Sequence, residues 1–271
     1  MRNSIVLAVV ILTLVWVPAV VLAATDANDA NKGVIQKQAA KSVEPIGWWK
    51  LNEKDGNTVQ DSSGNGFNAT VQLNGGPSIW APGEGFDSSG CAKFTARQII
   101  VIPNGVWGKV KDQLSIAFWV NQDSANPPGE TWPGPFGCAA TAGLSYPDPN
   151  WLQLRAFVPS PNKTIDIGKD SEHVYWDTGD ANAYAGVWNL YVFIKDANEH
   201  TLRLYHNDTP VASNFDAMEP MPKLNNFILG GRLYPNGDWN GKIDDLRIYN
   251  TVLSQDDVQK LFESKAGKAG K

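Results

Sequence analysis

Cysteine and basic clusters are scarce in this chain of 271 residues. Only Cys91 and Cys138 are present, which excludes a framework of several disulfides, and the histidines are not spaced as zinc ligands relative to them. The net charge is -5 at pH 7, and no basic cluster occurs outside the C-terminal tail. The chain therefore lacks the electrostatic footprint of a nucleic-acid-binding protein, and we expect no nucleic acid among its partners.

Signatures of common catalytic sites are also missing. The chain has no Gly-x-Ser-x-Gly, no His-Glu-x-x-His and no phosphate-binding glycine loop. Sugar hydrolysis needs two carboxylates about 5–9 Å apart on one face, yet no Glu-x-Asp-x-Glu or Glu-x-Asp-x-x-Glu strand occurs. The acidic residues between Asp166 and Asp177 fall in or near a loop, where a solvated surface is the simpler interpretation. The sequence thus predicts no catalytic residue.

The N-terminus carries an export signal. Met1-Arg2-Asn3 precedes an apolar run from Ile5 to Ala24 that ends in small residues, which is typical of a signal peptide over residues 1–24. The run is also long enough to span a bilayer, so an uncleaved membrane anchor is the alternative. Either interpretation predicts a secreted or cell-envelope protein, periplasmic or extracellular.

The remaining chain divides into a linker, one domain and a tail. Residues 25–43 are polar and predict a disordered linker. Residues 265–271 repeat Lys-Ala-Gly and predict a flexible tail. Residues 44–264 are enough for one domain with a sizeable core.

Within that domain, helical periodicity is nearly absent. Short alternating runs are separated by clusters of Gly, Pro, Asn and Asp, which is the pattern of an all-β sandwich or barrel. The clearest run is Leu114–Asn121, in which every second residue is a large apolar one. One short C-terminal helix is expected after Ser254, which is a candidate N-cap with Asp257 three residues on.

Four blocks resemble, in their order, the laminin-G-like family of concanavalin A-like jelly rolls found in exported bacterial proteins. The blocks are Trp48–Glu53 with Asp61–Gly66, Leu114–Trp119, Trp188–Asn207 and Gly230–Asn250. The resemblance implies a two-sheet antiparallel jelly-roll sandwich. It implies no single function, because this fold carries lectins, enzymes, adhesion modules and spacers.

The closing block predicts a buried charge. Alternation places Asp244 on the same face as Leu246 and Ile248, so its carboxylate should point into the core and needs a partner there. We expect that partner in Asp61–Gly66, which would make the first and last strands neighbours.

The family often binds a structural calcium near these two blocks. Asp61, Asn65 and Asp244 would then supply oxygen ligands to the ion. The alternative is that Asp61 makes turn hydrogen bonds and that Asp244 bonds backbone amides or a lysine.

A ligand-binding face is expected on the strands opposite the core. Residues there mix rings, which stack on sugars, with polar groups, which bond hydroxyls. Two long loops, Gln122–Asn150 and Gly168–Gly186, would rim this face unless they fold over it as a second small core. The candidate ligand-binding residues are Trp119, Gln153, Arg155, Tyr191, Trp132 and Trp176.

Export also bears on the two cysteines. A Cys91–Cys138 disulfide is expected in an exported chain and would tether the first long loop; the alternative is two buried thiols.

Taken together, the sequence predicts an exported binding module that recognises a glycan or another cell-surface or extracellular ligand. A glycan hydrolase or lyase with an unfamiliar site, and a structural envelope protein, remain the alternatives.

Overall fold

The computed structural model describes residues 42–95, 97–122, 140–142, 152–155, 164–169, 172–177, 186–221, 227–230 and 240–266. The predicted signal, linker and tail fall outside these residues, except at the edges of the linker and tail. None of the helices in these ranges is both apolar and long enough to cross a bilayer.

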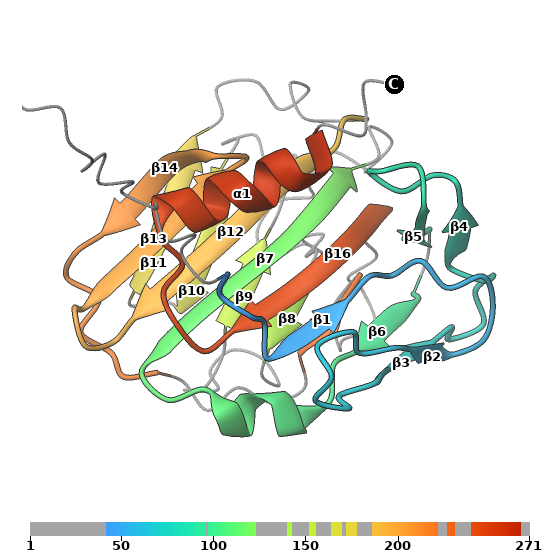
Figure 1. Ribbon diagram of the computed structural model, residues 1–271, viewed down its shortest axis with the longest axis horizontal. Coiled ribbons are helices and arrows are strands. Elements are labelled where there is room, and N and C mark those ends of the chain that lie inside the picture. The colour runs from blue at the N-terminus through green and yellow to red at the C-terminus, as the bar shows by residue number, and fades with distance from the viewer. Residues whose placement is uncertain are drawn as a thin grey trace, which may run out of the picture. The chain divides into compact units, whose positions relative to one another are not determined.

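Two antiparallel sheets build the domain (Figure 1), which confirms the predicted all-β jelly-roll sandwich. In spatial order, sheet A contains β14 (Thr209–Asn214), β13 (Thr201–His206), β12 (Asn189–Asp196), β7 (Gln113–Gln122), β16 (Gly241–Tyr249), β5 (Gly90–Phe94) and β4 (Trp80–Pro82), and β1 (Gly47–Trp49) also pairs with β16. Sheet B contains β11 (Glu172–Asp177), β10 (Thr164–Lys169), β9 (Leu152–Arg155), β8 (Ala140–Ala142), β15 (Ile228–Leu229), β6 (Ile99–Val101), β3 (Ala69–Gln72) and β2 (Thr58–Val59).

The main core lies between the sheets, and alternation along the strands explains it. On β7, the four residues Leu114, Ile116, Phe118 and Val120 join this core, as the sequence predicted. Trp119 points to the opposite face of sheet A, which we call the outer face. A strand with large apolar residues on both faces must be covered on both, since each exposed ring or branched side chain costs about 1.5–3 kcal/mol of lost burial.

The helix α1 (Gln255–Ala266) supplies the second cover and lies across the outer face of sheet A (Figure 1). A short 3-10 helix, η1 (Asn104–Lys109), precedes β7. The start of α1 is the predicted capping box: the Asp257 amide donates to Ser254 Oγ over 3.2 Å, and the Ser254 amide donates to Asp257 Oδ2 over 3.0 Å. Val258 of α1 is fully buried in the cluster that contains Trp119.

The first and last strands are neighbours, as the sequence predicted. Strand β1 pairs antiparallel with β16, and Trp48 lies opposite Arg247 in this register. Trp49 and Leu246, the next pair, are both fully buried in the main core. Trp48 and Arg247 therefore project together from the outer face.

The orientation predicted for Asp244 is wrong, because β16 contains a bulge. The register with β7 shifts between Asp244 and Arg247, and Asp245 has a φ of 53°. The extra residue lets Ile243 and Leu246 both face the main core, although they differ in parity. Asp244 instead lies opposite Trp119 and faces outward, where it is buried beneath the loop that carries Phe86.

Candidate functional site

A cavity of about 360 Å³ opens where β1, β16 and the end of α1 meet. We call it the Trp48 pocket. Its walls combine one indole with seven polar or charged side chains. The lining residues are Trp48, Lys50, Asn52, Asp87, Ser89, Asp245, Arg247 and Ser264.

Alternation along β1 and the bulge in β16 place the central groups of this pocket. Trp49 and Leu51 are fully buried, so Trp48 and Lys50 project outward between them. Arg247 reaches the same space because it lies opposite Trp48. Alternation already places Asp245 on the face of Arg247, and the bulge, at which Asp245 adopts a left-handed backbone, keeps its carboxylate there while it turns Asp244 outward as well.

Hydrogen bonds hold the indole in place. Trp48 Nε1 donates to Asp245 Oδ1 over 2.5 Å, and Arg247 Nη2 donates to Asp245 Oδ2 over 2.9 Å. The Arg247 guanidinium carbon lies 4.5 Å from the centroid of the Trp48 ring, and Lys50 Nζ lies 4.8 Å from it. Both cations are within the range of a cation–π attraction. The ring is therefore preorganised by a carboxylate and a guanidinium that are themselves paired.

Charge is retained within this cluster. Burial alone would lower the pKa of Arg247, but the adjacent Asp245 carboxylate and Tyr249 outweigh it and raise that pKa. Burial raises the pKa of Tyr249. The Arg247 side chain is 17% exposed and that of Asp245 is 4% exposed. The pair is thus largely removed from water, which strengthens it relative to a surface ion pair.

The opposite wall of the pocket comes from two loops. Asn52 follows β1, and Asp87 and Ser89 belong to the turn between β4 and β5. Asp87 Oδ1 accepts a hydrogen bond from the Ser89 amide over 3.1 Å, which orders this turn. Amide, hydroxyl and carboxylate groups thus line one cavity with an aromatic ring, and such a set can bond the hydroxyls of a sugar that packs against the ring.

The predicted binding face of Trp119 and Tyr191 is wrong in this structure. Trp119 is 2% exposed, with ring centroids 3.6 Å from Phe86 and 5.9 Å from Phe262 of α1. This part of the face is covered as a second core by α1 and by the loop that carries Phe86, whereas the two long loops named in the sequence alternative lie largely outside the described residues. Tyr191 points the other way, into the main core, because it lies opposite Phe118.

The other predicted ligand-binding residues are not brought together either. Gln153 and Arg155 lie on β9, which belongs to sheet B rather than to the sheet of Trp119. Trp176 lies on β11, half-buried, with its ring 4.7 Å from that of His206. Trp132 lies outside the described residues. The five predicted residues that the structure describes are therefore divided between the two sheets and do not share one face.

Asp61 organises its own loop. Its Oδ1 accepts from the amides of Trp48 and Ser63 over 3.0 and 2.9 Å, and its Oδ2 accepts from the Phe67 amide and from Ser63 Oγ over 2.9 and 2.8 Å. Burial would raise the pKa of Asp61, but these hydrogen bonds, with Ser63 foremost, outweigh it and lower that pKa. The carboxylate is engaged as the anchor of a turn.

The three predicted calcium ligands do not form one cation site. Strand β1 lies between Asp61 and β16, since Trp49 bridges to Asp61 on one edge and pairs with β16 on the other. Asp244 Oδ2 accepts from the Phe86 amide over 3.0 Å, and Asn65 Nδ2 donates to the Ile46 carbonyl over 3.1 Å. No cluster of three His, Cys, Asp or Glu residues suited to a metal occurs in the described ranges. The predicted niche shared by Asp61 and Asp244 is wrong, since each carboxylate makes its own turn or amide hydrogen bonds, and calcium binding itself stays a prediction.

Cys91 is a buried free thiol on β5. Burial, followed by the nearby Asp244 charge, raises its pKa to about 12. Cys138 lies outside the described residues, so the predicted disulfide stays a prediction.

The sheets and their order define a concanavalin A-like jelly-roll domain. The chain belongs to the laminin G-like family of the concanavalin A-like lectin/glucanases superfamily, whose family model matches residues 94–259. No curated protein matches the chain.

Solved structures share the fold at low sequence identity. Domain 4 of AbnA, an extracellular GH43 arabinanase of Geobacillus stearothermophilus solved with arabinotriose, is 21% identical with a TM-score of 0.58, over 82% of this chain and 99% of that one. The botulinum neurotoxin serotype D binding domain is 15% identical with a TM-score of 0.58, over 82% of this chain and 51% of that one. A Trypanosoma rangeli sialidase in complex with 2,3-difluoro-KDN is 14% identical with a TM-score of 0.58, over 84% of this chain and 34% of that one.

Alternation in the sequence places Trp48 and Lys50 on the outer side of the first strand, and Asp245 and Arg247 on the face opposite Leu246. None of these four residues was predicted as part of a site. The available signal was the expectation that these two strands are neighbours, which places all four residues on one surface.

Proposed function

We propose that this chain is an exported, non-catalytic carbohydrate-binding module and that the Trp48 pocket holds the sugar. The observation that carries the proposal is a preorganised indole facing amide, hydroxyl and carboxylate groups in one open cavity. Its volume of about 360 Å³ falls within the range of small-molecule sites, which is roughly 300–1,000 Å³.

The charges of the pocket favour a neutral glycan. Arg247 is paired with Asp245, and the remaining charged residues, Lys50 and Asp87, have opposite signs. A neutral sugar brings many hydroxyls, each of which can donate to a carboxylate or accept from an ammonium group. Asn52 and Ser89 add one amide and one hydroxyl to this set.

Neighbouring structures support a carbohydrate ligand. Domain 4 of AbnA was solved with arabinotriose and corresponds to this chain along almost its whole length. The toxin binding domain and the sialidase are longer, and this chain spans about half of the first and a third of the second. Their likeness supports the fold and leaves the ligand to be measured.

The state of Asp245 favours binding over catalysis. A hydrolase needs one carboxyl group that can carry a proton to the leaving oxygen. Both Asp245 oxygens already accept hydrogen bonds, from the Trp48 indole and from Arg247, so this carboxylate is held within the protein and is not free to contact a leaving oxygen. Asp87 also lines the pocket, so a hydrolase is the second candidate, and the experiment below includes a readout for it.

A glycan array with the purified protein tests the proposal. Two matched pairs of variants follow the array: Asn52→Ala with its control Asn57→Ala, and Lys50→Ala with its control Lys54→Ala. Neither control residue lines the pocket, and all four side chains are exposed, so folding is not at stake. We expect Asn52→Ala and Lys50→Ala to weaken binding of the neutral glycan that the array identifies, while the controls bind as the wild type does.

Three results would contradict the proposal. No binding to any neutral glycan would remove the carbohydrate ligand. Equal affinity in Asn52→Ala and Asn57→Ala would remove the Trp48 pocket as its site. Release of new reducing ends from a bound glycan, lost in Asp87→Asn, would show a hydrolase instead.

A further inference from the structure

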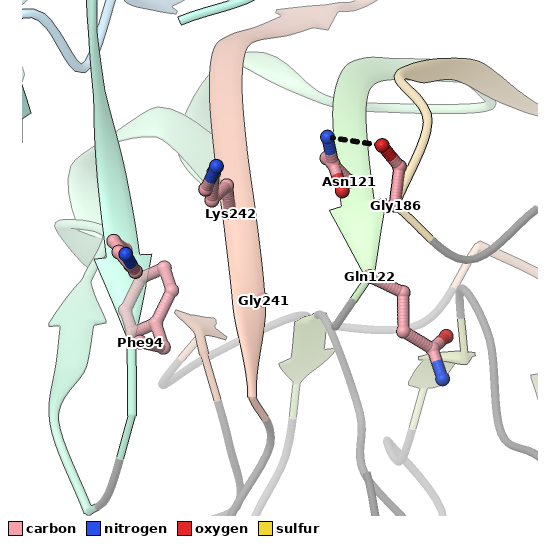
Figure 2. A pocket seen from close by; sticks show the side chains of 7 residues that line it. Phe94, Asn121, Gln122, Gly186, Gly241 and Lys242 are labelled. Atoms are coloured by element: carbon pink, nitrogen blue, oxygen red, sulfur yellow. Dashed lines mark hydrogen bonds between the residues drawn. The ribbon is translucent and has the colours of Figure 1, made fainter. Parts of the chain in front are cut away.

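A second cavity, of about 220 Å³, lies at one end of sheet A, where β5 and β7 end and β16 begins (Figure 2). We call it the lysine pocket. It shares no residue with the Trp48 pocket. The lining residues are Lys93, Phe94, Asn121, Gln122, Gly186, Gly241 and Lys242.

Strand register sets two positive charges side by side in this pocket. Lys242 lies opposite Lys93 on one neighbouring strand and opposite Asn121 on the other, so the three side chains form a row on the outer face. Like charges directly across from each other are destabilising unless an anion separates them. The lysine pair therefore needs a negative partner.

One carboxylate serves both lysines. Glu84 Oε2 lies 2.8 Å from Lys242 Nζ and 3.5 Å from Lys93 Nζ. Its side chain is 42% exposed, so this triad can open to solvent. Two ammonium groups against one carboxylate leave one positive charge in excess. Among these three residues, the charge balance therefore has room for a second carboxylate.

The wall beside the lysines is ordered by backbone contacts. The Gly186 amide donates to the Gln122 carbonyl over 2.8 Å, and Asn121 Nδ2 donates to the Gly186 carbonyl over 3.3 Å, the bond drawn in Figure 2. Gly186 is thus fastened to the end of β7 from both sides. A fixed wall of this kind reduces the ordering cost of binding a ligand against it.

Gln122, the last residue of β7, carries a buried acceptor. The residue is 3% exposed, and its Oε1 has no hydrogen-bond partner in the described part of the chain. A buried acceptor without a donor costs about 1–3 kcal/mol. Gln122 lies opposite Gly241 rather than Lys242, so its side chain projects on the other face of β7 from the lysines (Figure 2), and the bonds to ligand hydroxyls are left to Asn121.

We propose that the lysine pocket binds a hydroxylated carboxylate of the uronic-acid class. The carboxylate pairs with Lys93 and Lys242 in competition with Glu84, and hydroxyls bond the amide groups of the wall. This inference goes beyond the neutral sugar proposed for the Trp48 pocket, because it assigns a different ligand to different residues.

Titration of the full-length purified protein with glucuronate, against glucose as the uncharged match, tests this site by calorimetry at fixed ionic strength. We expect glucuronate to bind through Lys242, and any binding of glucose to be unaffected by changes in the lysine pocket. Lys242→Met should weaken glucuronate binding by up to about fivefold, the effect of losing one partly exposed ion pair. Glu84→Gln should strengthen it, because the competing carboxylate is gone. Lys111→Met, at an exposed lysine of neither pocket, should change nothing.

Failure of this proposal can be told from failure of the neutral-glycan site. Absence of glucuronate binding in both the wild type and Glu84→Gln overturns the lysine pocket. So does a Lys242→Met variant that binds like the wild type, which would mean non-specific attraction. Should Lys242→Met not fold, the Glu84→Gln comparison decides alone. Asn52→Ala, a change in the Trp48 pocket, should leave glucuronate affinity unaltered.

Discussion

Replacing Asp245 by Asn removes one negative charge from the centre of the Trp48 pocket and leaves the backbone undisturbed. Asp245 has a φ of 53°, and Asn is one of the few residues that adopt this conformation without difficulty. The variant leaves Arg247 without its anion, although its side chain is only 17% exposed. Breaking a fully buried pair costs about 3–5 kcal/mol, and a hydrogen bond to a charged group is worth about 1.5–3 kcal/mol. Since Arg247 keeps some solvent contact, we expect a loss of about 2–3 kcal/mol in unfolding free energy.

A second substitution separates charge from backbone conformation. Asp245→Ala should lose about 1–2 kcal/mol more than Asp245→Asn, because Ala pays the penalty of the left-handed region. Both variants are compared by urea unfolding, with Asp55→Asn, at an exposed aspartate outside the pocket, as the control. A double-mutant cycle with Trp48→Phe then measures the coupling between the indole N–H and Asp245.

Two results would refute this reasoning. If the unfolding free energy of Asp245→Asn lies within about 0.5 kcal/mol of that of the wild type, which is the usual scale of surface substitutions, the ion pair contributes little to stability. Equal stability of the Asn and Ala variants would mean that the bulge imposes no left-handed conformation at residue 245.

Three further predictions follow from the fold. The pKa of Asp61 is lowered on folding, so the stability that its carboxylate contributes is present above the unfolded-state pKa and is lost as the pH falls through the folded-state pKa. Asp61→Asn should therefore flatten the acid limb of a urea-unfolding series. If Asp61 anchors only a turn, a chelator should not shift the melting temperature of the wild type. Phe262→Ala should lower the free energy of thermal unfolding by about 1.5–3 kcal/mol and expose Trp119 to a fluorescence quencher. Unchanged quenching would contradict the covering role of α1. Cys91, with a pKa of about 12, should resist a thiol reagent at pH 8 in the native protein. In protein denatured without reductant, two reactive thiols would refute a Cys91–Cys138 disulfide, and the absence of reactive thiols would confirm it.

Local patterns predicted much of this architecture correctly. The period-two pattern of β7, the Ser254–Asp257 capping box and the outward position of Trp48 depend only on residues near one another in the sequence. The sequence also predicted that β1 and β16 are neighbours, on the basis of a niche shared by Asp61–Gly66 and Asp244. The niche is wrong, but the two strands do pair, with Trp48 opposite Arg247.

The predictions were wrong where local alternation does not determine which face of a strand points into the main core. At Asp245 one extra residue reverses the parity of the strand, and nothing in the alternating pattern marks a bulge there. On β12 both faces are apolar, so Tyr191 could have been placed on either one. The cover over Trp119 comes from Phe86 and from Phe262 of α1, which are distant in sequence. Such long-range packing decides which aromatic residues are open to a ligand.

The most direct test of the carbohydrate site is a titration that follows the indole N–H signals in a ¹H–¹⁵N NMR spectrum. A Trp48→Phe variant identifies the Trp48 signal among those of the eleven tryptophans. With the neutral glycan selected by the array, we predict a saturable shift of the Trp48 signal, whose N–H is bonded to Asp245, while the Trp119 signal, buried beneath α1, stays in place. A saturable shift confined to other tryptophans, with Trp48 unmoved, would contradict the account.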